Sequence, residues 1–85
     1  MTNQMKTVYE RGATVVERYR PARGPLQSVS TTIISVRHNA RGEPEVLTDT
    51  GRYFDGLTGA AIEKEAGCAR YIMLSKYAGK GHNRG

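Results

Sequence analysis

Residues 28–38 read Ser-Val-Ser-Thr-Thr-Ile-Ile-Ser-Val-Arg-His, a run in which almost every residue is β-branched or small. Such side chains lose rotamer freedom in a helix and fit the pleated surface of a sheet. The segment Asn39–Pro44 that follows (Asn-Ala-Arg-Gly-Glu-Pro) has the composition of a turn. Ser28–His38 is therefore predicted to be the clearest strand of a β-sheet protein.

Four shorter strands are expected around this one. In Ala13–Tyr19 the residues Val15, Glu17 and Tyr19 alternate with Thr14, Val16 and Arg18, which is the period of a strand. The other three predicted strands are Glu45–Asp49, Arg52–Phe54 after the tight turn Thr50-Gly51, and Ala69–Ser75, which is apolar on both faces.

Five short strands in so few residues indicate a small all-β barrel, because closure removes exposed sheet edges. An SH3-like barrel is preferred to an OB-like one, since the meander through residues 28–54 is continuous and an OB-fold usually needs more chain. Ala60–Ala66 is predicted to form one short helical turn, and Phe54 and Tyr71 are assigned to the core. The expected organisation is a disordered N-terminus (1–6), one domain (7–77) and a flexible, basic, glycine-rich tail (78–85).

Charge and cysteine content bound the setting and the partners. The chain has 13 lysines and arginines against 8 acids, a net charge of +5, and arginine supplies nine of the cations. This balance favours an anionic partner, although a solubilising surface would look the same. A single cysteine, Cys68, and the absence of a long apolar run predict a cytoplasmic protein that binds no membrane.

The segment Thr50–Gly59 (Thr-Gly-Arg-Tyr-Phe-Asp-Gly-Leu-Thr-Gly) resembles part of a pattern found in small bacteriophage β-barrel proteins of unknown function. In that pattern a first strand ending in basic residues precedes a β-branched strand, a glycine–arginine–aromatic–Phe–Asp segment, Thr-Gly and a closing strand. The resemblance covers roughly residues 13–76. It implies an SH3-like barrel, a viral origin and, if so, a place in the host cell cytoplasm, but it implies no activity.

Catalysis is not expected from this inventory of residues. The chain has two histidines (His38 and His82), one cysteine and scattered acids, with no catalytic triad motif, phosphate-binding loop or paired metal ligands. Cys68 is interpreted as a small buried residue. We therefore assign no catalytic residue, no metal site and no cofactor, and expect the protein to act by binding.

Arginines interleaved with an aromatic residue mark the candidate binding site. Cations that meet phosphates beside rings that stack on bases are what a groove for single-stranded nucleic acid requires. Two readings stay open: binding to nucleic acid or a nucleic-acid-processing complex, or docking of a phage-encoded inhibitor or modulator on an acidic surface of a host polymerase, nuclease or defence complex. A virion component is a third possibility. The candidate residues are Arg18, Tyr19, Arg20, Arg23, Arg37, Arg41 and Arg52.

Overall fold

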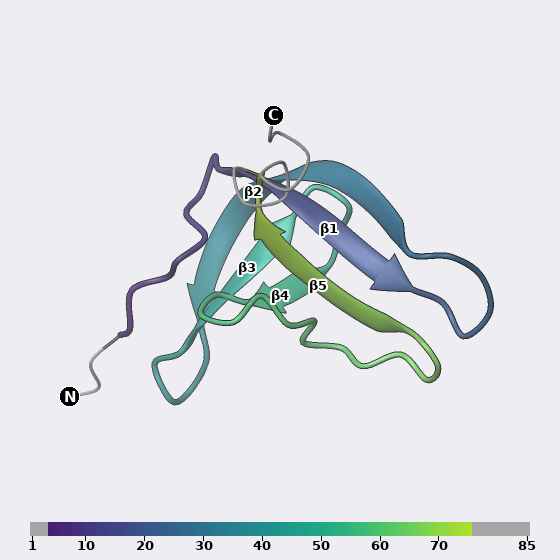
Figure 1. The fold of residues 1–85 in the computed structure, drawn as a ribbon. Helices are drawn as coiled ribbons and strands as arrows, with labels where there is room; N and C mark the ends of the chain where they lie inside the picture. Colours follow the sequence, from purple (N-terminus) through teal and green to yellow (C-terminus); the bar gives the residue numbers. More distant parts are fainter. Residues whose placement is uncertain (1–3, 76–85) are drawn as a thin grey trace.

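A computed structural model describes residues 4–75, which form five antiparallel strands in one curled sheet (Figure 1). In chain order the strands are β1 (Thr14–Arg20), β2 (Gln27–His38), β3 (Pro44–Thr48), β4 (Tyr53–Asp55) and β5 (Ala69–Leu74). Their order in space is β4-β3-β2-β1-β5, so the last strand returns to lie beside the first. The predicted small all-β fold is confirmed, and every strand end falls within one residue of its predicted position.

The long strand β2 holds the sheet together because it changes partner along its length. Its first half pairs with β1, from Gln27 opposite Tyr19 to Thr32 opposite Thr14. Its second half pairs with β3, and the register shifts between Ile33 and Ser35. Such an irregularity bends a strand and increases its twist, which lets one strand serve both halves of a curled sheet.

The segment between β4 and β5 links the two ends of the sheet. The Ile62 N–H donates to the Tyr53 carbonyl of β4 (3.1 Å), and the Ile72 N–H of β5 donates to the Gly59 carbonyl (2.8 Å). Gly59 has a φ of +83°, and a Cβ at this position would overlap the Ile72 carbonyl oxygen, so glycine is required. The helical turn predicted over Ala60–Ala66 is wrong, because this backbone bonds to strands on either side of it.

The core lies inside the curl and is small. Phe54 is fully buried, as predicted. The assignment of Tyr71 to the core is wrong: its residue is 37% exposed, because its neighbour Ile72 occupies the inward position on β5. The buried apolar residues are Tyr9, Val15, Ile33, Val46, Phe54 and Ile72, and they form one cluster.

The N-terminal segment contacts the end of β2 and the β2–β3 turn. Met5, which lies in the segment predicted to be disordered, donates its N–H to the Gly42 carbonyl (2.8 Å), and its carbonyl lies 2.9 Å from His38 Nε2. Residues 1–3 and the predicted tail (78–85) lie outside the described residues. Within residues 4–75 there is no helix with the length and apolar character needed to span a membrane.

Candidate partner-binding face

The predicted site arginines fall into two groups that differ in what surrounds their guanidinium groups. Arg37 belongs to the first group, whose members pair with carboxylates of the same chain. Its Nε lies 2.8 Å from Glu45 Oε1, and its Cζ lies 3.6 Å above the centre of the Tyr53 ring. The hydrogen bond to Glu45 raises the pKa of Arg37 above its usual value. Arg37 is thus held against the outer face of β3 and β4.

Arg41 and Arg52 are also paired. Arg41 lies 3.4 Å from a Glu43 carboxylate oxygen at the exposed β2–β3 turn. Arg52 Nε lies 3.8 Å from Glu17 Oε2, and Arg52 Nη1 lies 3.5 Å from Glu65 Oε2. The Arg52 guanidinium therefore lies near two carboxylates of the same chain, those of Glu17 and Glu65.

Glu17 is the centre of a buried charge network that the sequence analysis did not identify. Its side chain is only 2% exposed and accepts hydrogen bonds from Arg70 Nη1 (2.8 Å) and Thr50 Oγ1 (2.7 Å). The strand alternation places Glu17 on the same face as the buried Val15. A carboxylate on an apolar strand face needs a cationic partner, and this signal in the sequence could have revealed the network.

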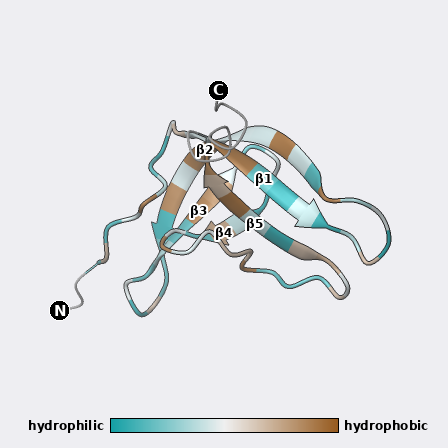
Figure 2. Ribbon diagram, viewed as in Figure 1, coloured by the Kyte–Doolittle hydropathy of each residue, from teal (hydrophilic) through white to brown (hydrophobic). Residues whose placement is uncertain are grey.

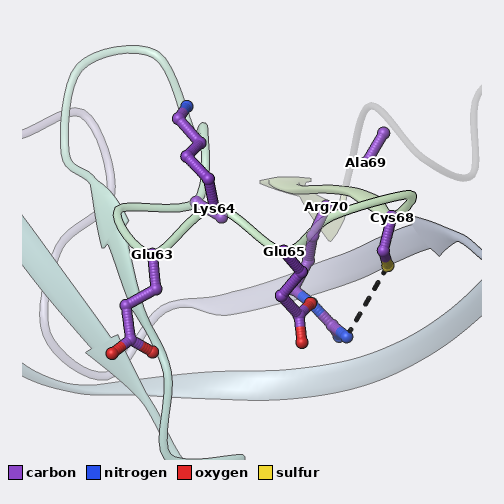
Figure 3. Close-up of a pocket in the computed structure, with 7 residues that line it drawn as sticks. Glu63, Lys64, Glu65, Cys68, Ala69 and Arg70 are labelled. Atoms are coloured by element: carbon purple, nitrogen blue, oxygen red, sulfur yellow. Dashed lines mark hydrogen bonds and ion pairs between the residues drawn. The ribbon is translucent and has the colours of Figure 1, made fainter.

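Arg70, which Figure 3 shows next to Glu65, is the cation that pairs with Glu17. Besides Glu17 it contacts Glu65, with Nε 2.9 Å from Oε1, and its Cζ lies 4.4 Å from the centre of the Tyr19 ring. Burial lowers the pKa of Arg70, but its hydrogen bonds to Glu65 and Glu17 outweigh burial and hold that pKa above its usual value. The predicted site residue Tyr19 therefore lies against Arg70.

A shallow pocket of about 220 Å³ borders the network beside Cys68. Arg70 Nη2 lies 4.0 Å from Cys68 Sγ, and Cys68 is partly exposed, whereas the sequence predicted it to be buried. In Figure 3 the Glu63 and Lys64 side chains extend away from Arg70, while Glu65 lies next to it. The residues that line the pocket are Ala61, Glu63, Lys64, Glu65, Cys68, Ala69 and Arg70.

Arg18, Arg20 and Arg23 form the second group, whose members are on β1 and in the β1–β2 loop. Within residues 4–75 none of the three forms an ion pair with a carboxylate. Arg20 and Arg23 are exposed, and Arg18 is half-buried, with an Nε that is shielded from water and has no acceptor. No acid occurs in the chain from Arg18 to Gly42, and Glu17, which precedes Arg18, faces the opposite side of β1.

The outer face of β1 and β5 places an exposed aromatic side chain beside these arginines. Arg18 and Arg20 alternate with the buried Glu17 and therefore lie on the outer face of β1. Arg18 is directly opposite Tyr71 of β5. In Figure 2 the hydrophilic second half of β1 lies beside the hydrophilic start of β5. We use the name arginine face for Arg18, Arg20 and Tyr71 of this surface together with Arg23 of the adjoining β1–β2 loop.

Comparisons with known proteins give no relative from which a function could be carried over. No family model, curated protein or solved structure matches this chain.

Proposed function

We propose that this protein binds nucleic acid through the arginine face and acts as a binding protein, without catalysis. The observation that carries the proposal is that, within residues 4–75, Arg18, Arg20 and Arg23 have no carboxylate partner, while Arg37, Arg41, Arg52 and Arg70 are each paired with a carboxylate. A protein of net charge +5 with eight acids has enough carboxylates to place some beside these three arginines. Because no carboxylate of residues 4–75 pairs with these three arginines, their guanidinium groups stay available for phosphates.

Two further features of the face support a single-stranded ligand. Tyr71 is exposed opposite Arg18, and base stacking on an aromatic ring combined with nearby cations is the usual way in which single strands are bound. The Arg18 Nε has no acceptor in the described structure, and an unsatisfied buried donor is costly. A phosphate that draws the Arg18 side chain toward it would relieve this cost.

The test is the salt dependence of binding to a fluorescently labelled single-stranded oligonucleotide. If three arginines each neutralise one phosphate, log Kd should rise with log salt with a slope of about 2, from about 0.7 per phosphate of a single strand. The triple variant Arg18→Ala/Arg20→Ala/Arg23→Ala should lose most of this slope. The double variant Arg37→Ala/Arg41→Ala, which removes paired arginines, should retain it. A wild-type protein that binds no oligonucleotide at low salt refutes the proposal.

Docking on an acidic surface of another protein is the second candidate function. It is favoured by Val16 and Met73, which are cross-strand partners, lie on the same outer face as Tyr71 and are only partly buried. Apolar contacts surrounded by arginine and tyrosine are typical of protein interfaces. The bacteriophage resemblance makes a bacterial host the source of such a partner, with the protein acting as an inhibitor or modulator in the host cytoplasm.

Pull-downs from bacterial lysate with and without nuclease treatment separate the two candidates. For the docking function, the wild-type chain should retain one stoichiometric protein, and Arg20→Glu/Arg23→Glu should release it. Retention that disappears when the lysate is treated with nuclease supports nucleic acid as the ligand instead.

A further inference from the structure

The first half of β2 has a backbone edge that no other strand covers within residues 4–75. The residues Gln27–Ser30 are all exposed, although they belong to a strand in the middle of the sheet order. β1 pairs with one side of this half, whereas β3 pairs with β2 only from Ile33 onward. Figure 1 shows β2 arching across the sheet, first beside β1 and then beside β3. In residues 4–75 this half of β2 therefore has a strand on one side and an open edge on the other.

The hydrogen bonds around β2 show which backbone groups face the open edge and where it ends. The Ile33 N–H donates to a carbonyl just before β1 (3.0 Å), and the Thr32 carbonyl accepts from the Asp49 N–H (3.0 Å) on the opposite side. Because this direction alternates along a strand, the N–H and carbonyl groups of Ser28 and Ser30 face the open side. The open edge thus offers two N–H groups and two carbonyls, and it ends where Asp49 covers Thr32.

This edge lacks the features with which proteins usually prevent strand pairing. Residues 26–32 contain no charge, no proline and no glycine. Natural sheet edges that stay unpaired usually carry lysine, proline or a bulge. Leu26 is 39% and Val29 is 42% exposed, so apolar side chains also flank the edge. A strand added here would gain both backbone hydrogen bonds and apolar contact.

Arg18 determines which charge an added strand should carry. Arg18 is the cross-strand partner of Ser28, so both side chains lie on the outer face of the sheet. A residue opposite Ser28 on an added strand would share that face, with its backbone two strand spacings, roughly 10 Å, from that of Arg18. Only the short Ser28 side chain lies between them in this row. Arg18 has no carboxylate partner within residues 4–75 and an Nε without an acceptor, so a carboxylate on the added strand complements it.

The two ends of the open edge differ in charge, and this difference fixes where the acid should lie. The β1–β2 loop that leads into β2 carries the exposed Arg23, and the exposed Arg20 ends β1 beside it. The other end of the edge is next to the exposed Asp49. An acid on the added strand is therefore favoured opposite Ser28 and toward the loop, and it is disfavoured opposite Ser30.

We propose that this edge binds an extended acidic peptide segment of a partner protein, which pairs with β2 as an added antiparallel strand. The peptide residues opposite Ser28 and Ser30 then exchange four backbone hydrogen bonds with β2. The peptide carries a glutamate or aspartate opposite Ser28, an apolar residue opposite Val29 and an uncharged residue opposite Ser30. The proposal goes beyond nucleic-acid binding and gives the docking candidate a specific ligand.

The first experiment adds a synthetic peptide to the ¹⁵N-labelled full chain without nucleic acid. The probe is acetyl-Ser-Thr-Val-Glu-Val-Glu-Ser-amide, whose threonine falls opposite Ser30 and whose first glutamate falls opposite Ser28. The amide signals of Ser28 and Ser30 should shift and become protected from hydrogen exchange. The Val29 amide, which faces β1, is the internal control and should be protected without peptide. Binding that leaves the Ser28 and Ser30 amides unprotected, or no binding, overturns the proposal.

Two altered peptides separate backbone pairing from attraction between charges. Methylation of the amide nitrogen of the first glutamate keeps the charge but removes a hydrogen bond to β2, and it should weaken binding by about fivefold or more. Replacing both glutamates by lysine keeps the backbone and should also weaken binding. A methylated peptide that binds as tightly as the probe would show charge attraction alone and would refute strand addition.

Variants of the chain test the same contacts from the other side. Ser30→Pro removes an N–H that faces the open edge and is not used by β1, and it should weaken binding of the probe by about fivefold or more. Arg18→Ala should weaken binding by about two- to fivefold, whereas the control Arg37→Ala, whose guanidinium pairs with Glu45, should not. Circular dichroism checks that each variant is folded. A folded Ser30→Pro chain that binds the probe like the wild type counts against the arrangement.

The labelled oligonucleotide, tested on the same samples, distinguishes this proposal from nucleic-acid binding. A chain that binds the peptide at Ser28 and Ser30 but binds no oligonucleotide supports the edge and refutes the nucleic-acid function. A chain that binds the oligonucleotide but not the peptide refutes the edge and leaves the nucleic-acid function in place.

Discussion

Arg70 and Arg20 are two arginines on neighbouring strands whose surroundings are opposite. Arg70 is 11% exposed at its side chain and contacts two carboxylates and the Tyr19 ring. Arg20, one residue further along β1 than Tyr19, is exposed and has no carboxylate partner in the described part of the chain. The difference shows that the inner face uses arginine to neutralise a buried carboxylate, whereas the outer face carries an arginine that has no carboxylate partner within residues 4–75.

The largest expected effect comes from breaking the inner network. Glu17→Ala removes the buried carboxylate that accepts a hydrogen bond from Arg70 and leaves that cation with Glu65 alone, so the free energy of unfolding should fall by about 1.5–3 kcal/mol. Urea denaturation followed by circular dichroism measures this change. The double variant Glu17→Met/Arg70→Met should recover much of the loss, because it leaves no unpaired charge. A loss below about 1 kcal/mol for Glu17→Ala would contradict a structural role for this network.

The next largest effect tests the aromatic member of the arginine face. If Tyr71 stacks on a base, Tyr71→Ala should weaken binding to a single-stranded oligonucleotide by about 1–3 kcal/mol, with little change in the salt slope. The matched control is Tyr53→Ala, since the Tyr53 ring lies under Arg37 and away from the arginine face. Fluorescence anisotropy at constant salt measures both affinities. Equal losses for the two variants would mean that Tyr71 does not contact the ligand.

The strands were predictable from the sequence because local chemistry determines them. The β-branched run of β2 and the alternation in β1 specify extended backbone whatever the rest of the chain does. The Gly59–Ile62 segment was not predictable in this way. Its four residues have no periodic pattern, and they extend only because β4 and β5 offer hydrogen bonds on both sides.

The candidate site was only partly predictable, for a similar reason. The alternation placed Glu17 on the inner face, but its partner Arg70 is 53 residues away, and such pairings depend on tertiary structure. The sequence could not show that Arg52 pairs with carboxylates while Arg20 does not, since both residues lie near strand ends. The exposure of Tyr71 was missed because the β5 strand is apolar on both faces, and alternation alone cannot tell which face is inward.

A smaller effect concerns Glu65, the more exposed carboxylate that pairs with Arg70, and it depends on pH. The hydrogen bond from Arg70 holds the pKa of Glu65 below its ordinary value of 4.5. Because the folded pKa is lower than the unfolded one, this interaction stabilises the fold above pH 4.5 and is lost as the pH falls below it. Glu65→Gln should therefore show a shallower loss of stability in acid than the wild type. Thermal unfolding measured above and below pH 4.5 gives the loss of stability in acid for each protein. The control Glu63→Gln, which changes an exposed neighbour, should lose stability with falling pH as steeply as the wild type.

The smallest expected effect is the most direct check on the contrast between the arginines that pair with carboxylates and those that do not pair within residues 4–75. Arg20→Ala and Arg23→Ala should each change the free energy of unfolding by less than about 0.5 kcal/mol, because neither side chain pairs with a carboxylate in residues 4–75. Arg52→Ala should cost more, since it removes a cation from the buried Glu17. Urea denaturation ranks the three variants. A protein in which Arg20 and Arg23 matter to stability as much as Arg52 does would be one whose outer arginines serve the fold, and the case for a ligand on that face would fail.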